Sequence, residues 1–289
     1  MSCYILYNPM AGNGMAQGEL ETLSSFCGGE AIRLDMTKIE SYADFFAPLS
    51  EEDAVVICGG DGTLNRFVND TEGLNISCDM LYYALGSGND FLRDVGRSVS
   101  EGPFSVKQYI QNLPTVEVKG KTYRFLNNVG FGIDGYCCEV GDQCKAKSDK
   151  PVNYTAIAIK GALFFYKPTT ATIVIDGETY TYKKVWIAPT MKGRYYGGGM
   201  NAAPEQDRTA PDGKLSVVTL HNASRLQLLM VFPSIFKGEH VNYKKFVTIH
   251  TGYDIHVKFD RPTALQIDGE TVLDVTEYKV KAKVPATIA

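Results

Sequence analysis

Short glycine-bearing motifs near the start of the chain carry residues suited to binding phosphate. The strongest, Cys58–Asn65, has the sequence CGGDGTLN and follows the apolar run Ala54–Cys58. Glycines lack a Cβ atom, so backbone N–H groups can approach a ligand closely, and a helix starting here directs its free N–H groups to the same place. The alternative is a tight turn in which Asp61 and Thr63 cap the helix. The motif is not a Walker A loop, because no Gly-Lys-Ser/Thr follows.

Two further motifs repeat this design. Leu85–Phe91 (LGSGNDF) offers the short polar side chains of Ser87, Asn89 and Asp90, which suit ribose, phosphate or a metal-bound water, or a helix cap. Asn8–Gly14 (NPMAGNG) follows another apolar run. Because the carboxyl ends of parallel strands meet at one sheet edge, the three motifs predict one shared ligand site.

Alternating strands and helices are expected to position these motifs, which predicts βαβ units and a parallel sheet. The expected strands are Tyr4–Tyr7, Ala31–Leu34, Ala54–Cys58 and Met80–Leu85. The expected helices are Met15–Phe26, Tyr42–Leu49, Thr63–Asp70 and Asn89–Val95.

The second half of the chain is expected to be mostly antiparallel β-structure packed as a sandwich. Only Asn153–Tyr166 and Ser224–Phe236 have clear helical patterns here. The expected strands are Val116–Val118, Arg124–Asn128, Ala171–Ile175, Tyr180–Ala188, Leu215–Leu220, Lys245–Thr251, Asp254–Phe259 and Ala264–Ile267. The predicted domains are therefore an α/β nucleotide-binding domain over residues 1–120 and a β-sandwich substrate domain over residues 121–289.

Composition excludes several other classes of protein. The 289 residues are 44% hydrophobic with a net charge of −4, which is ordinary for a folded chain and does not favour a nucleic-acid binder. No apolar run is long enough for a transmembrane segment, and Met1–Pro9 does not resemble a signal peptide. The seven cysteines are expected to be reduced thiols in the cytoplasm, and Cys137, Cys138 and Cys144 lack zinc-site spacing.

Together the motifs resemble the diacylglycerol kinase catalytic-domain family, the bacterial lipid kinase group related to sphingosine and NAD kinases. The resemblance continues through Asn127–Gly132, Gly197–Met200 with Ala203-Pro204, Asp212–Leu215 and Ile267–Glu270. It implies an α/β nucleotide domain and a β-sandwich with the active site between them. It also implies that Tyr278–Val284 returns toward the first domain.

The resemblance implies that ATP contacts the three motifs and a threonine after the second strand. The implied residues are Asn8, Thr37, Gly59, Gly60, Asp61, Gly62, Thr63, Leu64, Asn65, Arg66, Ser87, Asn89 and Asp90. Arg66 stands where the family usually has a glutamate. It either contacts phosphate or is a solvated helix residue, and we favour the second interpretation.

A carboxylate near the attacking hydroxyl would accept its proton during phosphoryl transfer. We favour Glu270, with Asp268 orienting it or holding Mg²⁺ through water, since both would face one side of an extended segment. Asp61 is the rival base. The same tripeptide at Asp176–Glu178 is interpreted as a hairpin turn.

The resemblance also implies a structural Mg²⁺ held by Asp212 and the carbonyl groups of Thr209 and Lys214. Oxygen ligands suit this hard cation. Pro211 replaces a carboxylate that the family usually has, which puts this metal site in doubt.

The implied function is an ATP- and Mg²⁺-dependent lipid kinase that phosphorylates a hydroxyl of a diacylglycerol-like or sphingoid-like lipid. The alternatives are an NAD-kinase-like small-molecule kinase and a non-catalytic nucleotide-binding regulator. The expected partner is a lipid substrate at the membrane surface, with the protein in the cytoplasm or peripheral at the inner membrane face, and a homodimer is left open. Ala162–Tyr166 and Arg194–Tyr196 would suit an interfacial enzyme, although core packing is the commoner role of such residues.

Overall fold

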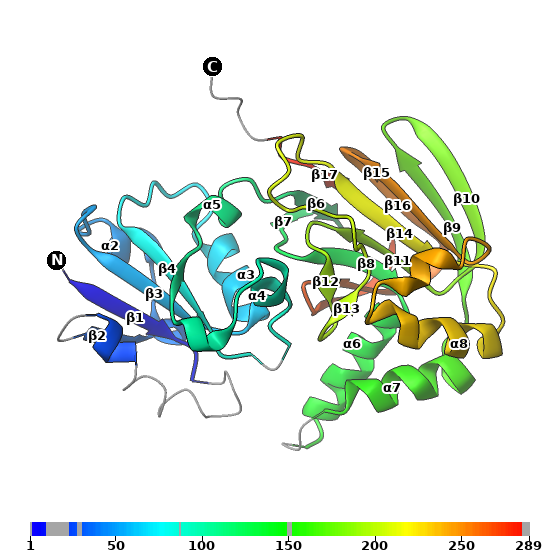
Figure 1. Ribbon diagram of the computed structural model, residues 1–289, viewed down its shortest axis with the longest axis horizontal. Helices are drawn as coiled ribbons and strands as arrows, with labels where there is room; N and C mark the ends of the chain where they lie inside the picture. The colour runs from blue at the N-terminus through cyan, green and yellow to red at the C-terminus, as the bar shows by residue number, and fades with distance from the viewer. Residues whose placement is uncertain (1, 10–22, 28–30, 87, 149–151, 285–289) are drawn as a thin grey trace. The chain divides into compact units, whose positions relative to one another are not determined.

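The chain forms two compact units, Met1–Asn112 and Leu113–Ala289 (Figure 1). The computed structural model describes residues 2–9, 23–27, 31–86, 88–148 and 152–284. The predicted boundary after residue 120 lies slightly further along the chain than the division after Asn112.

The first unit contains a five-stranded sheet in the order β2-β1-β3-β4-β5. Its strands are β1 (Cys3–Tyr7), β2 (Ala31–Asp35), β3 (Ala54–Gly59), β4 (Asp79–Ala84) and β5 (Phe104–Ser105). The first four run parallel and β5 is antiparallel. The predicted parallel sheet is thus confirmed, with an edge strand that was not predicted.

Helices of the first unit follow the strands. They are η2 (Met36–Lys38), α2 (Tyr42–Phe46), α3 (Asp61–Asp70), α4 (Asp90–Asp94), η3 (Val99–Glu101) and α5 (Lys107–Ile110). Helix α3 buries Leu64, Phe67 and Val68, and the Phe67 ring meets the Tyr42 ring of α2 edge-on at 5.4 Å. The predicted helix Met15–Phe26 lies outside the described residues except for Leu23–Phe26, which are helical.

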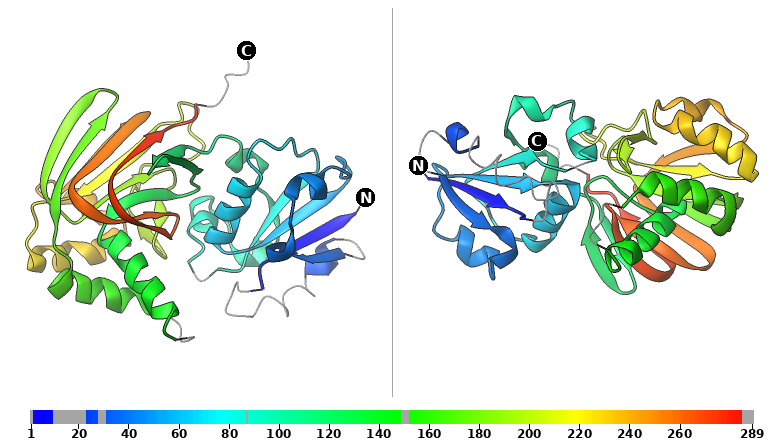
Figure 2. Two further views of the ribbon diagram at one scale, coloured as in Figure 1. Left: turned by 180° about the vertical axis from the view of Figure 1, so that it is seen from behind. Right: turned by 90° about the horizontal axis from the view of Figure 1, so that it is seen from below.

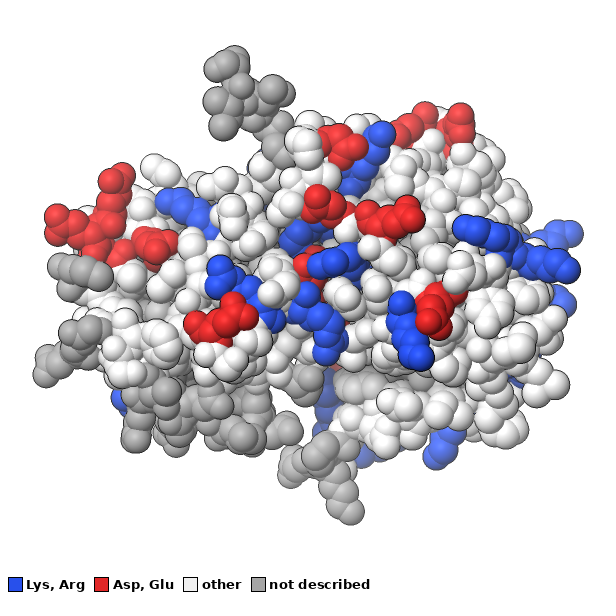
Figure 3. Space-filling model, in the orientation of Figure 1, with Lys and Arg blue, Asp and Glu red and all other residues white. Residues whose placement is uncertain are grey.

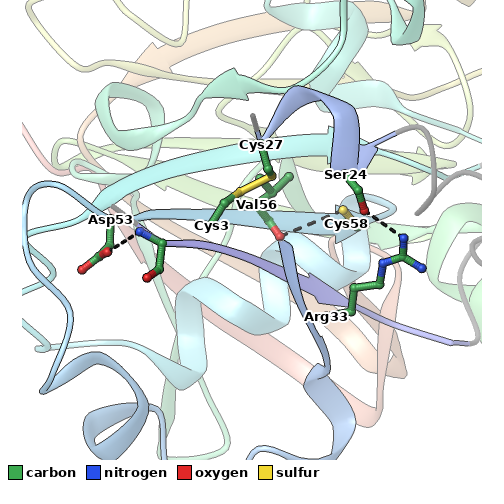
Figure 4. The surroundings of a disulfide bond; sticks show 8 residues. Cys3, Ser24, Cys27, Arg33, Asp53, Val56 and Cys58 are labelled. Atoms are coloured by element: carbon green, nitrogen blue, oxygen red, sulfur yellow. Dashed lines mark hydrogen bonds between the residues drawn. A yellow bond between two sulfur atoms is a disulfide. The ribbon is translucent and has the colours of Figure 1, made fainter. Parts of the chain in front are cut away.

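A disulfide bond joins Cys3 of β1 to Cys27 (Figure 4). Near it, the Arg33 guanidinium donates a hydrogen bond of 2.8 Å to Ser24 Oγ. The expectation that all seven cysteines are thiols is wrong for this pair, because pairing depends on spatial proximity that spacing along the chain does not reveal.

The second unit contains a ten-stranded antiparallel sheet, as predicted. Its strands are β6 (Thr115–Val118), β7 (Lys121–Arg124), β8 (Asn128–Gly132), β9 (Thr169–Ile175), β10 (Glu178–Val185), β11 (Ile187–Met191), β14 (Leu215–Leu220), β15 (Val247–Gly252), β16 (Asp254–Ile267) and β17 (Glu270–Lys281). A separate small hairpin consists of β12 (Tyr195–Tyr196) and β13 (Met200–Asn201).

The long strand β16 makes the sheet sandwich-like. Its first half, Ile255–Phe259, pairs with β9, and Leu265–Ile267 pairs with β8. Register shifts lie between these halves, where such irregularities let a strand change direction. The rings of Phe131 and Phe259 lie 4.2 Å apart in the enclosed core.

The last strand, β17, pairs with β16 and with β6. Lys279–Lys281 lie opposite Thr115–Glu117, the start of the second unit. The segment Tyr278–Val284 was expected to return toward the first domain. Up to Lys281, its residues pair with strands of the second unit.

Helices of the second unit gather on one side of its sheet in both views of Figure 2. They are α6 (Ile133–Lys145), α7 (Tyr154–Lys160), the π-helical turn η4 (Gly161–Phe165) and α8 (Arg225–Ile235), with the 3₁₀ turn η5 (Glu239–Asn242) after α8. The predicted helices Asn153–Tyr166 and Ser224–Phe236 are confirmed. Among the described residues, no helix has both the length and the apolar character to cross a bilayer.

Helix α6 was not predicted, because its glycines and cysteines have low helix propensity. Close packing explains one of these glycines. A Cβ atom at Gly135 would lie 2.1 Å from the carbonyl oxygen of Ala264 on β16. Burial raises the pKa of the Cys137 and Cys138 thiols to about 12, so both stay protonated.

Asp134 lies in the first turn of α6, and its Oδ2 atom is buried although the residue as a whole is half-buried. Burial raises the pKa of this carboxyl to about 6, against the partial effect of the hydrogen bond from Gly135 N–H. The folded state therefore holds a proton here at pH values where the unfolded chain has lost it.

We predict that Asp134→Asn becomes more stable relative to the unmodified protein as pH rises. Between about pH 4 and about pH 6 the original protein loses stability, because ionisation of Asp134 is easier in the unfolded chain. Over this pH range, the unfolding free energy of Asp134→Asn minus that of the original protein should grow by about 2 kcal/mol. Urea unfolding followed by fluorescence of Trp186, the single tryptophan, reports the second unit. If the two proteins differ in unfolding free energy by the same amount at every pH, the Asp134 carboxyl does not have a raised pKa.

The disulfide predicts the thiol content. Denatured, unreduced protein should react with five equivalents of a thiol reagent, and reduced protein with all seven cysteines. Cys27→Ser should give six equivalents before reduction, because it frees Cys3. Seven equivalents in the unreduced original protein would rule out the bond.

Candidate active site

Asn8 and the two glycine motifs that follow β3 and β4 meet at the carboxyl edge of the sheet of the first unit. Asn8 follows β1, and its side-chain amide donates a hydrogen bond of 3.3 Å to Thr63 Oγ1 at the start of α3. Leu85 N–H, directly after β4, donates to the Gly59 carbonyl at 2.9 Å. Asn8 and the described residues of the loops after β3 and β4 therefore form one rim, which we call the glycine rim, while residues 10–14 of the first motif lie outside the described residues.

Two glycines allow the loops to approach each other. A Cβ atom at Gly60 would lie 3.1 Å from Gly86 Cα, and one at Gly86 would lie 2.8 Å from Gly60 Cα. A side chain at either position would force the backbones apart. The rim thus presents bare backbone beside the N-terminus of the ten-residue helix α3, an arrangement that suits an anionic phosphate.

Asp61 connects the same two loops through its carboxylate. Oδ2 accepts a hydrogen bond from Asp90 N–H at 2.9 Å, and Oδ1 accepts one from Phe91 N–H at 3.0 Å. Asp61 therefore caps α4 from outside that helix. Asn89, in a left-handed conformation, precedes α4, and its buried Oδ1 has no hydrogen-bond partner among the described residues.

The remaining sequence-predicted nucleotide residues have varied surroundings. Leu64 and Asn65 are buried in α3, whereas Arg66 is exposed and its Nε lies 3.4 Å from Asp70 Oδ2. Thr37 donates a hydrogen bond of 2.6 Å from Oγ1 to Asp35 Oδ1. This bond is the main reason that the pKa of the Asp35 carboxyl is lowered. Ser87 lies outside the described residues.

In the second unit, Asp268 and Gly269 form the turn between β16 and β17. Their φ angles are 47° and 93°, as in the two-residue hairpins that favour Asp-Gly. Asp268 Oδ1 accepts hydrogen bonds from Asn127 N–H at 2.7 Å and Asn128 N–H at 2.9 Å, and Oδ2 accepts one from Leu126 N–H. This carboxylate therefore fixes the turn to the strand end before β8.

The expectation that Asp268 and Glu270 share one face of an extended segment is wrong, because a turn separates them. Glu270 begins β17, and its side chain is exposed. Among the described residues, no hydrogen bond or ion pair engages its carboxylate. The structure thus gives the two acids different environments, with Asp268 anchored to backbone and Glu270 open to solvent.

The second Asp-Gly-Glu tripeptide forms the same kind of turn. Asp176 and Gly177 have φ angles of 50° and 90° between β9 and β10, as the predicted hairpin requires. The Asp176 carboxylate accepts hydrogen bonds from the backbone N–H groups of Tyr253 and Asp254. Here, however, the Tyr180 hydroxyl donates to Glu178. The two turns thus share an anchored aspartate but differ in the environment of the glutamate.

Two buried cations near the Asp268 turn were not found from the sequence. The Arg208 guanidinium donates a hydrogen bond of 2.8 Å to Asn127 Oδ1, and Lys192 N–H donates one of 2.8 Å to the Asn127 carbonyl. Both side chains are almost fully buried. Nothing in a single sequence marks a lysine or arginine as buried. The one available signal is that Lys192 and Arg208 lie near the Gly197–Gly199 run in the sequence.

Two of the oxygen groups in the Thr209–Lys214 loop have partners within the chain. The Lys214 carbonyl accepts a hydrogen bond of 2.9 Å from the Gln206 amide, and Asp212 Oδ2 lies 3.8 Å from Lys214 Nζ. The Lys214 ammonium group therefore acts as the counter-ion of the Asp212 carboxylate. Among the described residues, no cluster of His, Cys, Asp and Glu could hold a metal. The structural Mg²⁺ site implied by the resemblance has a single carboxylate, Asp212, and relies otherwise on carbonyl groups, so it stays a prediction and we assign no step to it.

The fold and the glycine rim define a class of two-unit proteins in which an α/β unit with glycine-rich loops after its parallel strands precedes an antiparallel β-unit. Residues 2–116 match the diacylglycerol kinase catalytic domain, and residues 127–288 match the YegS C-terminal NAD kinase beta sandwich-like domain. The chain belongs to this diacylglycerol kinase catalytic-domain family.

Individual relatives agree with this family. Over 203 residues the chain is 25% identical to a diacylglycerol kinase of Mycobacterium tuberculosis (strain ATCC 25618 / H37Rv), a match that spans 68% of this chain but only 64% of that relative. It is 23% identical to a diacylglycerol kinase of Bacillus subtilis (strain 168), over 92% of this chain and 88% of the relative. A crystal structure of a diacylglycerol kinase from Bacillus anthracis str. Sterne has the same fold, with a TM-score of 0.62, 17% identity and coverage of 98% and 94%.

We predict that Asp268→Gly lowers the unfolding free energy of the second unit by about 2–4 kcal/mol. Glycine tolerates the positive φ angle, so the loss reports mainly the backbone N–H groups left without their charged acceptor. Glu270→Gln at the exposed neighbouring position should change it by less than about 0.5 kcal/mol. Urea titrations followed by Trp186 fluorescence measure both. Equal midpoints for Asp268→Gly and the original protein would disprove the anchoring role.

Proposed function

We propose that the chain is an ATP- and Mg²⁺-dependent lipid kinase that phosphorylates a hydroxyl of a diacylglycerol-like or sphingoid-like lipid. The single observation that carries this proposal is the glycine rim, where Gly60 and Gly86 leave backbone exposed beside the N-terminus of α3. Family membership supports the choice of a lipid alcohol as acceptor.

The glycine rim would hold the phosphates of ATP. Bare backbone after β3 and β4 suits the triphosphate, and the Asn8–Thr63 hydrogen bond joins the end of β1 to the start of α3. Mg²⁺ bound with the nucleotide would neutralise phosphate charge during transfer. Arg66 contributes little in this proposal, because it is exposed and paired with Asp70.

Glu270 would accept the proton of the lipid hydroxyl. In this step the hydroxyl O–H bond breaks, the proton moves to the Glu270 carboxylate, the hydroxyl oxygen bonds to the γ-phosphorus, and the bond from that phosphorus to the bridging oxygen breaks to release ADP. Glu270 is favoured over Asp61, because both oxygens of Asp61 already accept backbone hydrogen bonds from α4. Asp268 would position Glu270 by fixing the turn before it.

The lipid acceptor determines where the enzyme would act. Lipids with long acyl chains reside in bilayers, so the proposed reaction takes place at a membrane surface. We propose a cytoplasmic protein that reaches its acceptor at the inner membrane face.

The role of Glu270 can be tested with ATP and diacylglycerol in mixed micelles. Glu270→Gln should lower kcat at least about a hundredfold, because the general base is lost, and leave ATP affinity and Tm unchanged. Phosphate transfer is followed with radiolabelled ATP, and ATP affinity by calorimetry. Retention of most of the kcat would remove Glu270 from the mechanism.

The duplicated tripeptide provides a matched control. Glu178→Gln changes the same residue in the same kind of turn and should keep full activity. Gly86→Ala provides the opposite control and should abolish ATP binding, because its Cβ atom collides with Gly60. Transfer to NAD alone would favour a small-molecule kinase, and ATP binding without transfer to any acceptor would favour a regulator.

A further inference from the structure

An unusually apolar surface covers part of the helical side of the second unit. Four large apolar side chains are exposed there: Leu226 by 78%, Phe164 by 69%, Phe165 by 62% and Met230 by 57%. Core packing was the commoner expectation for Ala162–Tyr166. It holds for Ala162 and Tyr166, which are buried, but is wrong for Phe164 and Phe165.

Helix α8 is apolar on both of its faces. Leu228, Val231 and Ile235 pack into the core, whereas Leu226, Met230 and the following Phe236 face outward. The outer face of a helix in water normally carries charged side chains, but no charged residue lies between Arg225 and Lys237. An apolar outer face of this kind marks an interaction site.

The adjoining turn η4 presents its aromatic rings from a fixed backbone. The Arg225 guanidinium donates hydrogen bonds to the carbonyl groups of Ala162 and Tyr166, and it lies 5.5 Å from the Trp186 ring centroid. Tyr166 N–H donates to the Gly161 carbonyl at 2.8 Å, which closes the π-helical turn. Arg225 thus joins η4 to α8, so that the exposed residues of both elements belong to one rigid surface.

The charge of these segments is entirely positive. Residues 152–168 and 221–238 contain Lys160, Lys167, Arg225 and Lys237 and no carboxylate, although the whole chain has a net charge of −4. Lys160, Lys167 and Lys237 are exposed. In Figure 3 the lower right of the view, over α8, is mostly white, with blue and some red at its margins. Apolar side chains bordered by cations are complementary to an anionic bilayer.

We propose that α7, η4 and α8 form a docking face for an anionic lipid bilayer. Phe164, Phe165, Leu226 and Met230 enter the boundary between headgroups and acyl chains, while the exposed lysines bind anionic headgroups. The choice of a bilayer as partner rests on the proposed function, which requires a lipid acceptor. The docking itself requires neither nucleotide nor catalysis.

Insertion of the aromatic rings can be observed directly. The only native tryptophan, Trp186, is buried, so Phe164→Trp adds an exposed reporter. Its emission should shift to shorter wavelength on addition of phosphatidylcholine vesicles containing phosphatidylglycerol, and lipids brominated on their acyl chains should quench it. The original protein controls for changes at Trp186. If the Phe164→Trp protein sediments with the vesicles but its emission does not change, the aromatic rings do not insert and this part of the proposal is wrong.

Sedimentation with the same vesicles measures affinity in the absence of ATP. Replacing Phe164, Phe165, Leu226 and Met230 together by serine should weaken binding at least about tenfold. Serine at Ile32 and Leu273, exposed apolar residues on β2 and β17, is the matched control and should leave binding unchanged. Lys160→Gln with Lys237→Gln should weaken binding to anionic vesicles by about fivefold per lysine and leave binding to pure phosphatidylcholine unchanged.

Two further readouts distinguish membrane docking from catalysis and from self-association. Phosphorylation of short-chain dioctanoylglycerol in detergent micelles tests the kinase apart from docking, and the serine variant should keep that activity. Vesicle binding by a protein with no kinase activity would support docking and contradict the proposed function. Full vesicle binding by the serine variant would overturn docking. A protein that is dimeric in analytical ultracentrifugation, becomes monomeric in the serine variant and binds no vesicles would show that the face binds a second copy of the chain instead.

Discussion

The close approach of two backbones, at Gly60 and Gly86, is the constraint on which the candidate nucleotide site depends. Strands β3 and β4 end side by side, and their loops can remain in contact only without Cβ atoms. This contact brings the start of α3 beside the loop that leads into α4, where Asp61 bonds to the first N–H groups of α4. The backbone surface offered to phosphate therefore follows from packing between glycines.

The second unit uses a charged side chain to achieve comparable rigidity. Asp268 holds the β16–β17 turn against the segment before β8, which fixes the backbone at Glu270, while no described residue bonds to the Glu270 carboxylate. The turn at Asp176 has the same backbone and the same kind of anchor, yet its glutamate accepts a bond from Tyr180. The aspartate and glycine of such a tripeptide thus serve the fold. Any chemical role belongs to the glutamate and depends on what surrounds it.

Local patterns predicted much of this molecule. The four parallel strands, α3, α7 and α8 were all found, because apolar periodicity and capping residues act over short distances. Contacts between distant segments were not found. The Cys3–Cys27 bond, the Ala264 carbonyl against Gly135, and the anchoring of Asp268 all join residues that spacing alone does not place together. The exposure of Phe164 and Phe165 was missed for a related reason, since an apolar run has the same composition whether it faces the core or solvent.

The pairing of β17 with β6 has a consequence for how the chain folds during synthesis. The first unit is continuous in sequence and ends at Asn112, so it can complete its structure while the ribosome is still making the remainder. The second unit opens with β6, whose neighbour β17 follows every other described strand along the chain. Until that neighbour emerges, the edge of β6 stays unpaired, and its closure over such a long sequence separation is expected to be slow.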